Sequence, residues 1–159
     1  MIKLCIASFF IILVIALNTS VAEEIAIIVN KDNGIEGVSL ADLKKIFKAE
    51  RTFWGKGSKI QLIMRPRDSI ETKVLLENIY EIPLEEFTAF WLKLVYSGKV
   101  DRVPPTINSA SIVNVLVSQT KGAVAPIEVG RISKLAKVKI LKIDGKMPND
   151  EGYPLKTRE

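Results

Sequence analysis

A short segment with two arginines and two hydroxyl side chains holds the residue types best suited to binding chemistry. Its sequence is RPRDSIET, over residues 65–72, and it lies between a predicted strand and a predicted helix. The first turn of a helix carries unpaired N–H groups and the positive end of the helix dipole, which together favour an anion. Arginine adds paired charge-assisted hydrogen bonds to phosphate or carboxylate, and hydroxyls add single donors. We therefore predict a ligand-binding site for a small anion, formed by Arg65, Arg67, Ser69 and Thr72.

The same segment also fits a purely structural role. Asp68 and Glu71 have the spacing of a capping box, in which the protein's own side chains satisfy the N–H groups of the helix start. Two acidic side chains at this point would repel a phosphate, and Arg65 and Arg67 would then pair with those acids. The residue types leave anion binding and helix capping open as alternatives.

The rest of the composition limits the available chemistry. The 159-residue sequence has no histidine, and its one cysteine, Cys5, lies in an N-terminal apolar run. Histidine is the commonest general base and the commonest metal ligand, and a thiolate is a common nucleophile. We therefore predict that the protein is not an enzyme, has no catalytic residues, and uses neither a metal nor a cofactor. This composition favours a binding role.

The first 22 residues have the pattern of a secretory signal. Lys3 precedes an apolar run over residues 4–17, and Ser20-Val21-Ala22 supplies the small residues of a cleavage site. The run is short for a membrane span, which needs roughly 20 apolar residues. We predict cleavage after Ala22 and a periplasmic or secreted protein. The alternative is an uncleaved signal that anchors the chain to a membrane. Cleavage removes one positive charge, Lys3, and so lowers the formal net charge from +5 to +4.

The positive charges are scattered, with one denser stretch near the C-terminal end. A solvated edge strand protected by lysines explains such a stretch, and so does an attraction for anions. Aromatic residues are not interleaved with these charges as they are in nucleic-acid platforms, so we expect no nucleic-acid partner. The stretch comprises Arg131, Lys134, Lys137, Lys139, Lys142 and Lys146.

Hydrophobic periodicity predicts a mixture of strands and helices. Runs rich in Ile and Val predict strands over residues 24–30, 59–64, 122–127 and 138–143. Apolar residues at helical spacing predict helices that begin near Ser39, Asp68, Pro83 and Ser109, the last of them largely buried. This order predicts an α/β fold with a mixed β-sheet flanked by helices. We expect a single domain over residues 23–145, followed by a loose tail over residues 146–159.

The two tryptophans each admit a packing role and a ligand-stacking role. Trp91 falls on the apolar stripe of the predicted third helix, and Trp54 falls in a loop flanked by glycines. Packing is the favoured role for both, because an indole contributes a large apolar area to a core.

Several segments are similar, in order and spacing, to one protein family. IAIIVNKDN and VSLADLKKIFKAERTFWGKG follow that family's pattern of strand, turn, Leu-rich helix and Trp-containing loop. KIQLIMRPRDSIET resembles a strand that runs into an Arg-x-x-x-Ser-Gly-Thr anion loop. FTAFWLKLVYSGKVDRVPP, KGAVAPIEVG and VKILKIDG are similar to the helix and strands that follow. On these segments the chain resembles the small periplasmic-binding-protein-like domains related to the phosphate-binding component of bacterial phosphate ABC transporters.

This resemblance implies one periplasmic-binding-protein-like lobe. It also implies an exported solute-binding-like protein that takes phosphate or a similar small inorganic anion for an ABC-type uptake system. Arg65 and Ser69 stand where the family has the Arg and Ser of its anion loop. Ile70-Glu71 stands where the family has Gly-Thr, and Thr72 follows one place late. The alternative is an envelope protein-interaction module, with a protein partner or as a homodimer, that keeps the fold without the anion pocket.

Overall fold

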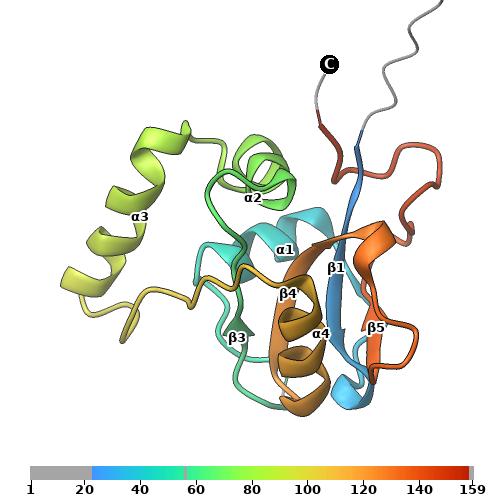
Figure 1. Ribbon diagram of the computed structural model, residues 1–159. Helices are drawn as coiled ribbons and strands as arrows, with labels where there is room; N and C mark the ends of the chain where they lie inside the picture. Colours follow the sequence, from blue (N-terminus) through green and yellow to red (C-terminus); the bar gives the residue numbers. More distant parts are fainter. Residues whose placement is uncertain (1–22, 56, 158–159) are drawn as a thin grey trace, which may run out of the picture.

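A computed structural model describes residues 23–55 and 57–157 (Figure 1), so the predicted signal over residues 1–22 lies outside the described residues. The strands are β1 (Ile25–Asn30), β2 (Gly37–Val38), β3 (Gln61–Leu62), β4 (Ala123–Glu128), β5 (Val138–Ile140) and β6 (Lys142–Ile143). The helices are α1 (Leu40–Phe47), α2 (Ile70–Leu75), α3 (Leu84–Tyr96) and α4 (Ala110–Gln119). Three short turns of helix complete the list: η1 (Lys31–Asn33), the π-helical η2 (Leu76–Tyr80) and η3 (Val129–Arg131).

The predicted mixed sheet is confirmed. Within the described residues, its strand order is β3-β4-β1-β5, with β3 parallel to β4 and with β1 antiparallel to both β4 and β5. A second, two-stranded sheet pairs β2 with β6 in parallel. In Figure 1, α4 lies against one face of the larger sheet, and α1 and α2 lie toward the other face.

Strand β1 is central because its apolar residues supply both faces of the sheet. All six of its residues are buried, and successive side chains point to opposite faces. Ile25, Ile27 and Val29 join the larger core cluster with α1 and α2, whereas Ala26 and Ile28 join the cluster under α4. An unbroken apolar run therefore marks a strand that is covered on both sides.

Serine side chains fix the starts of three helices. The Oγ atoms of Ser39, Ser69 and Ser109 accept hydrogen bonds from the backbone N–H groups of Asp42, Thr72 and Ile112. Each satisfies one of the N–H groups that a helix start leaves without an internal partner. These caps make the helix starts predictable from sequence, and the starts after Ser39 and Ser109 are confirmed.

Two predicted strands are shorter than expected, and one predicted helix is less buried. The strand predicted over 138–143 is broken at the buried Leu141, whose N–H still donates to Ile27 O (2.8 Å), and the chain then leaves the main sheet to form β6. The strand predicted over 59–64 shortens to β3. Helix α4 is amphipathic rather than largely buried, because Ile112 and Val115 are exposed.

The prediction of a loose tail is wrong for residues 146–157. Tyr153 and Leu155 are fully buried in the larger core cluster. The Tyr153 hydroxyl donates to Ile25 O (3.0 Å), and Ile25 N donates to Leu155 O (3.1 Å). Glu23 and Thr157 then hydrogen-bond to each other, Glu23 N to Thr157 Oγ1 (3.1 Å) and Thr157 N to Glu23 O (3.0 Å). The last segment therefore covers one end of the core beside β1.

Helix α3 stands apart from the other helices (Figure 1), and aromatic contacts join it to Tyr80. The Tyr80 ring meets Phe87, Phe90 and Trp91 edge-on, with ring centroids 5.0, 5.4 and 6.3 Å away. The Tyr80 hydroxyl donates to Phe47 O (3.0 Å), and burial raises the pKa of this phenol well above its ordinary value. Trp91 is therefore a core residue as predicted. Trp54 is also buried, with its Nε1–H donating to Gly122 O (3.0 Å).

The buried C-terminal segment gives a direct test of the fold. We expect Leu155→Ala to lower the free energy of unfolding by about 2–5 kcal/mol, because it deletes buried methyl groups from a packed core. The matched control, Lys156→Ala, changes an exposed side chain and should stay within about 0.5 kcal/mol. Urea unfolding measures both variants. Equal, negligible effects would mean that residues 146–157 do not contribute to the core.

Candidate functional site

Arg65 is a buried arginine whose side chain joins three segments of the chain. It is 5% exposed and directly follows Met64, which pairs with Thr106 in a parallel bridge. This pairing brings the segment after Thr106 alongside, and Arg65 Nη1 donates to Ile107 O (2.6 Å) and Asn108 O (2.8 Å). Arg65 Nε donates to Glu71 Oε1 at 3.1 Å. These three hydrogen bonds fix the orientation of the guanidinium and direct it toward internal acceptors.

Glu71 provides the counter-charge for this arginine. It is 2% exposed, and its Oε1 accepts from Arg65 Nε (3.1 Å) and from the backbone N–H of Glu128 (3.2 Å). A guanidinium and a backbone N–H are the donors that an oxyanion prefers. In this structure, the donors surround the carboxylate of a side chain, which neutralises the buried positive charge.

The two predicted hydroxyl ligands also have internal partners. Ser69 Oγ accepts a hydrogen bond from Thr72 N (3.2 Å), which caps α2. The same hydroxyl donates a hydrogen bond to Thr72 Oγ1 (3.3 Å). Thr72 is fully buried, and its Oγ1 donates to Arg65 O (3.1 Å). Helix capping is therefore the role of this segment in the structure, but the cap is Ser69 rather than Asp68. Glu71 pairs with Arg65 instead of returning to the cap.

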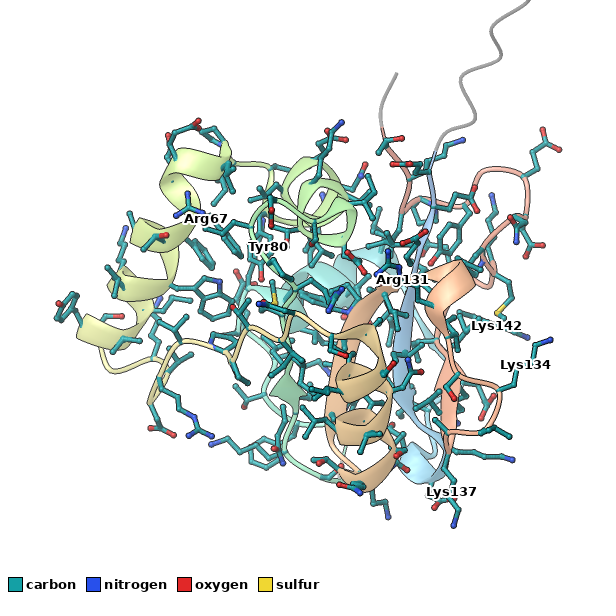
Figure 2. All side chains as sticks on the ribbon, in the orientation of Figure 1. Arg67, Tyr80, Arg131, Lys134, Lys137 and Lys142 are labelled. Carbon is teal, nitrogen blue, oxygen red and sulfur yellow. The ribbon has the colours of Figure 1, made fainter. Side chains whose placement is uncertain are left out.

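Arg67 points away from the other three residues. Figure 2 places it beside α3, where its Nη1 donates to Thr88 Oγ1 (2.9 Å) and its Nη2 donates to Leu84 O (3.1 Å). It ties the start of α3 to the segment that leads into α2. The structure thus brings Arg65, Ser69 and Thr72 together, and leaves Arg67 outside the group.

The sequence pattern could not locate every member of this cluster. The N–H of Glu128 lies 57 positions from Glu71, and the two accepting carbonyls lie 42 and 43 positions from Arg65. These partners depend on how β4 and the segment before α4 pack, and they carry no local signal. The acidic residue at position 71 is the one local sign that the site holds its own anion.

The basic stretch near the C-terminal end follows the sheet edge at β5. Figure 2 shows Lys134 and Lys142 extending away from this edge, with Lys137 at its lower end. Lys139 pairs with Glu36 (2.6 Å), which lowers the pKa of that carboxyl, and Arg131 pairs with Glu128 (2.8 Å). The stretch fits a solvated edge strand whose lysines discourage pairing with another sheet.

Among residues 23–55 and 57–157, the side chains of His, Cys, Asp and Glu never gather in groups of three that could hold a metal ion. Within the same residues, every helix is too short or too polar to cross a bilayer.

The fold is similar to solved structures of phosphate-binding proteins. An ABC-type phosphate transport receptor from Vibrio cholerae has 20% sequence identity and a TM-score of 0.62, with 80% of this chain and 48% of that chain covered. A putative phosphate ABC transporter substrate-binding protein with bound phosphate, from Clostridium perfringens, has 17% identity and a TM-score of 0.60 (78% and 46% covered). PstS from Borrelia burgdorferi has 16% identity and a TM-score of 0.61 (85% and 55% covered).

These structures establish a shared fold at low identity, and this chain spans about half the length of each. No curated protein matches the chain. A family model described as a PBP superfamily domain matches residues 19–156, which is most of the sequence and includes residues 146–156 of the segment predicted as a tail. The predicted resemblance is confirmed, and the chain belongs to the PBP superfamily, with a lobe fold shared with substrate-binding proteins of phosphate ABC transporters.

Proposed function

We propose that this chain is an exported module of the PBP superfamily that has its own carboxylate in the anion site, and that it acts by binding a protein in the cell envelope. The observation that supports this function is the position of Glu71 Oε1 between Arg65 Nε and Glu128 N. The donors that would hold a phosphate already hold an anion that belongs to the chain. Such a module keeps the lobe fold and does not act as a phosphate receptor.

Magnitudes favour the side chain over a free ion. A phosphate could reach Arg65 only after Glu71 leaves the pair. Phosphate would then replace the carboxylate as the counter-charge of Arg65, so the exchange swaps one anion for another, and a ligand that binds at millimolar concentration supplies only about 4 kcal/mol in all. The displaced Glu71 carboxylate must also find a new partner or reach water, which makes the exchange unfavourable. If Glu71 stayed, two like charges would share one site, which is also unfavourable.

A second function has one observation in its favour. Arg65, Ser69 and Thr72 gather at one helix start, as the phosphate-binding family resemblance implies. A chain that bound phosphate or a similar oxyanion for an ABC-type uptake system would need Glu71 to move away from Arg65. This function requires phosphate to bind the unmodified protein measurably.

Calorimetry with the mature protein distinguishes the two functions. We expect no heat of binding from phosphate or sulfate at up to about 10 mM in low salt, because displacement of Glu71 offsets the affinity. Saturable heat with the unmodified protein would contradict the filled site and support uptake. In that case Ser69→Ala, which keeps the Arg65–Glu71 pair, should weaken the binding.

Removing the carboxylate tests whether it occupies an anion site. We expect Glu71→Ala to lower the free energy of unfolding by about 3–5 kcal/mol, because Arg65 is left buried without a counter-charge. Phosphate should then raise the melting temperature of Glu71→Ala, but not that of the unmodified protein, since an added anion restores the charge balance. Thermal unfolding in phosphate, compared with chloride of equal ionic strength, measures this.

Glu151→Ala is the matched control, because Glu151 is an exposed acid in a turn. It should lose less than about 0.5 kcal/mol and show no specific response to phosphate. If phosphate stabilises Glu71→Ala no more than Glu151→Ala, the region around Arg65 does not accept anions, and the carboxylate serves packing alone.

The envelope partner is tested by photo-cross-linking in cells that express the full chain. A photoreactive amino acid is placed separately at Tyr96, Ile112 and Leu135, which are exposed on α3, on α4 and in the loop before β5. We expect an adduct with an envelope protein from at least one site. The mass of the recovered chain should equal that of a chain that begins at Glu23. The absence of adducts at all three sites, or a chain retained in the cytoplasm, would contradict the proposed function.

A further inference from the structure

A cavity lies apart from the Arg65–Glu71 pair. Its volume is about 750 Å³, and it is open on one side. It is bounded by β3, the loop after α1, the linker over residues 99–105 and the last turns of α4, with Trp91 of α3 at its inner end. Arg65, Ser69, Glu71 and Thr72 do not line it. Its size is in the range of small-molecule pockets, which is about 300–1,000 Å³.

Much of the lining of this cavity is apolar. It includes Ile46, Ile60, Leu62 and Trp91 from the side of the larger core cluster, and Leu116 from the cluster under α4. Ile46 and Trp91 belong to the buried core, whereas Ile60 and Leu62 pack against that core and are partly exposed. A molecule that covered these side chains would remove apolar area from water, which is favourable in proportion to the area.

The rim is strongly basic. Arg51, Lys59, Lys99 and Arg102 line the cavity with one acid, Asp101, a formal balance of +3. The acid is exposed and lies 3.6 Å from Lys59 Nζ. The side chains of Lys99 and Arg102 are exposed and make no hydrogen bond or ion pair with any described residue. Two cations are therefore available at the mouth of an apolar cavity, and they attract an anion.

Trp91 adds a polar group without a partner. Its side chain is 3% exposed, and its Nε1–H has no hydrogen-bond acceptor among the described residues. A buried donor left without an acceptor is unfavourable. Trp91 borders the cavity, but its Nε1 is shielded from solvent, so the ring and not the N–H faces an occupant. The apolar lining and the basic rim are therefore the two features that select the occupant.

We propose that this cavity binds a small organic anion with an apolar body, of the class of aromatic sulfonates and medium-chain carboxylates. The apolar body packs against Ile60, Leu62 and Leu116, and the anionic group pairs with Lys99 and Arg102 at the rim. Inorganic phosphate lacks the apolar body and does not fill the cavity. Neutral molecules of the same size lack the charge that the rim selects. This site is independent of the proposed interaction function.

The probe is 1-anilinonaphthalene-8-sulfonate, which joins an aromatic body to one sulfonate. With the mature native protein, we expect saturable fluorescence enhancement with one probe per chain. Lys99→Glu with Arg102→Glu should weaken the affinity about tenfold or more, because two attractions become repulsions. The charge-matched control, Lys134→Glu with Lys137→Glu on the β5 side, should change the affinity less than about twofold. Urea unfolding of both double variants measures whether their free energy of unfolding stays that of the native protein.

Competition separates the alternatives. Octanoate should displace the probe, whereas octanol at the same concentration and phosphate at about 10 mM should not. Absence of saturable binding, equal weakening in the two double variants, or equal displacement by octanoate and octanol would each overturn the proposal. Displacement by phosphate would also overturn it, and would assign the rim cations to inorganic anions. None of these results depends on the phosphate calorimetry or on the cross-linking, so the two proposals fail separately.

Discussion

The buried ion pair between Arg65 and Glu71 connects four separate segments of this lobe. Through Arg65 it reaches the carbonyls of Ile107 and Asn108, and through Glu71 it reaches the N–H of Glu128. It therefore links the exit from β3, the start of α2, the segment before α4 and the end of β4. A buried pair of this kind adds little net stability, but removal of one partner leaves an uncompensated charge, so its geometry is strongly constrained. Helix α2 and the sheet cannot shift relative to each other without separating it.

The elements that the sequence predicts well are those with local causes. The run IAIIVN is apolar at every position except the last, as expected of a strand such as β1 that is covered on both faces. The serine caps at Ser39 and Ser109 mark helix starts through hydrogen bonds that span three residues. The fold class follows from the order of such elements. For the candidate site, the sequence places Arg65, Ser69 and Thr72 at one predicted helix start, and this local arrangement is why the three residues meet.

The features that the sequence does not reveal depend on distant contacts. Tyr153 and Leu155 stand among Pro, Gly and charged residues, a composition typical of a loose end. Both are buried because the start of β1 provides an apolar surface and, at Ile25, a carbonyl for the Tyr153 hydroxyl. Lys142 begins a new strand because β2 offers a free edge at Gly37, 105 positions earlier. Arg67 faces α3 because Leu84 and Thr88 lie there. In each case the deciding partner is remote in the chain and close in space.

The hydrogen bonds between Glu23 and Thr157 place the two ends of the described chain side by side. The described chain therefore enters and leaves this lobe at neighbouring points on its surface. If the lobe were inserted into a surface loop of another protein, the two sides of that loop would be separated by about 5 Å, the spacing of neighbouring strands. Circular permutation is equally feasible, because a short linker can join the two neighbouring ends while new termini are placed in an exposed turn. This lobe is therefore suited to serve as an insert as well as a free-standing protein.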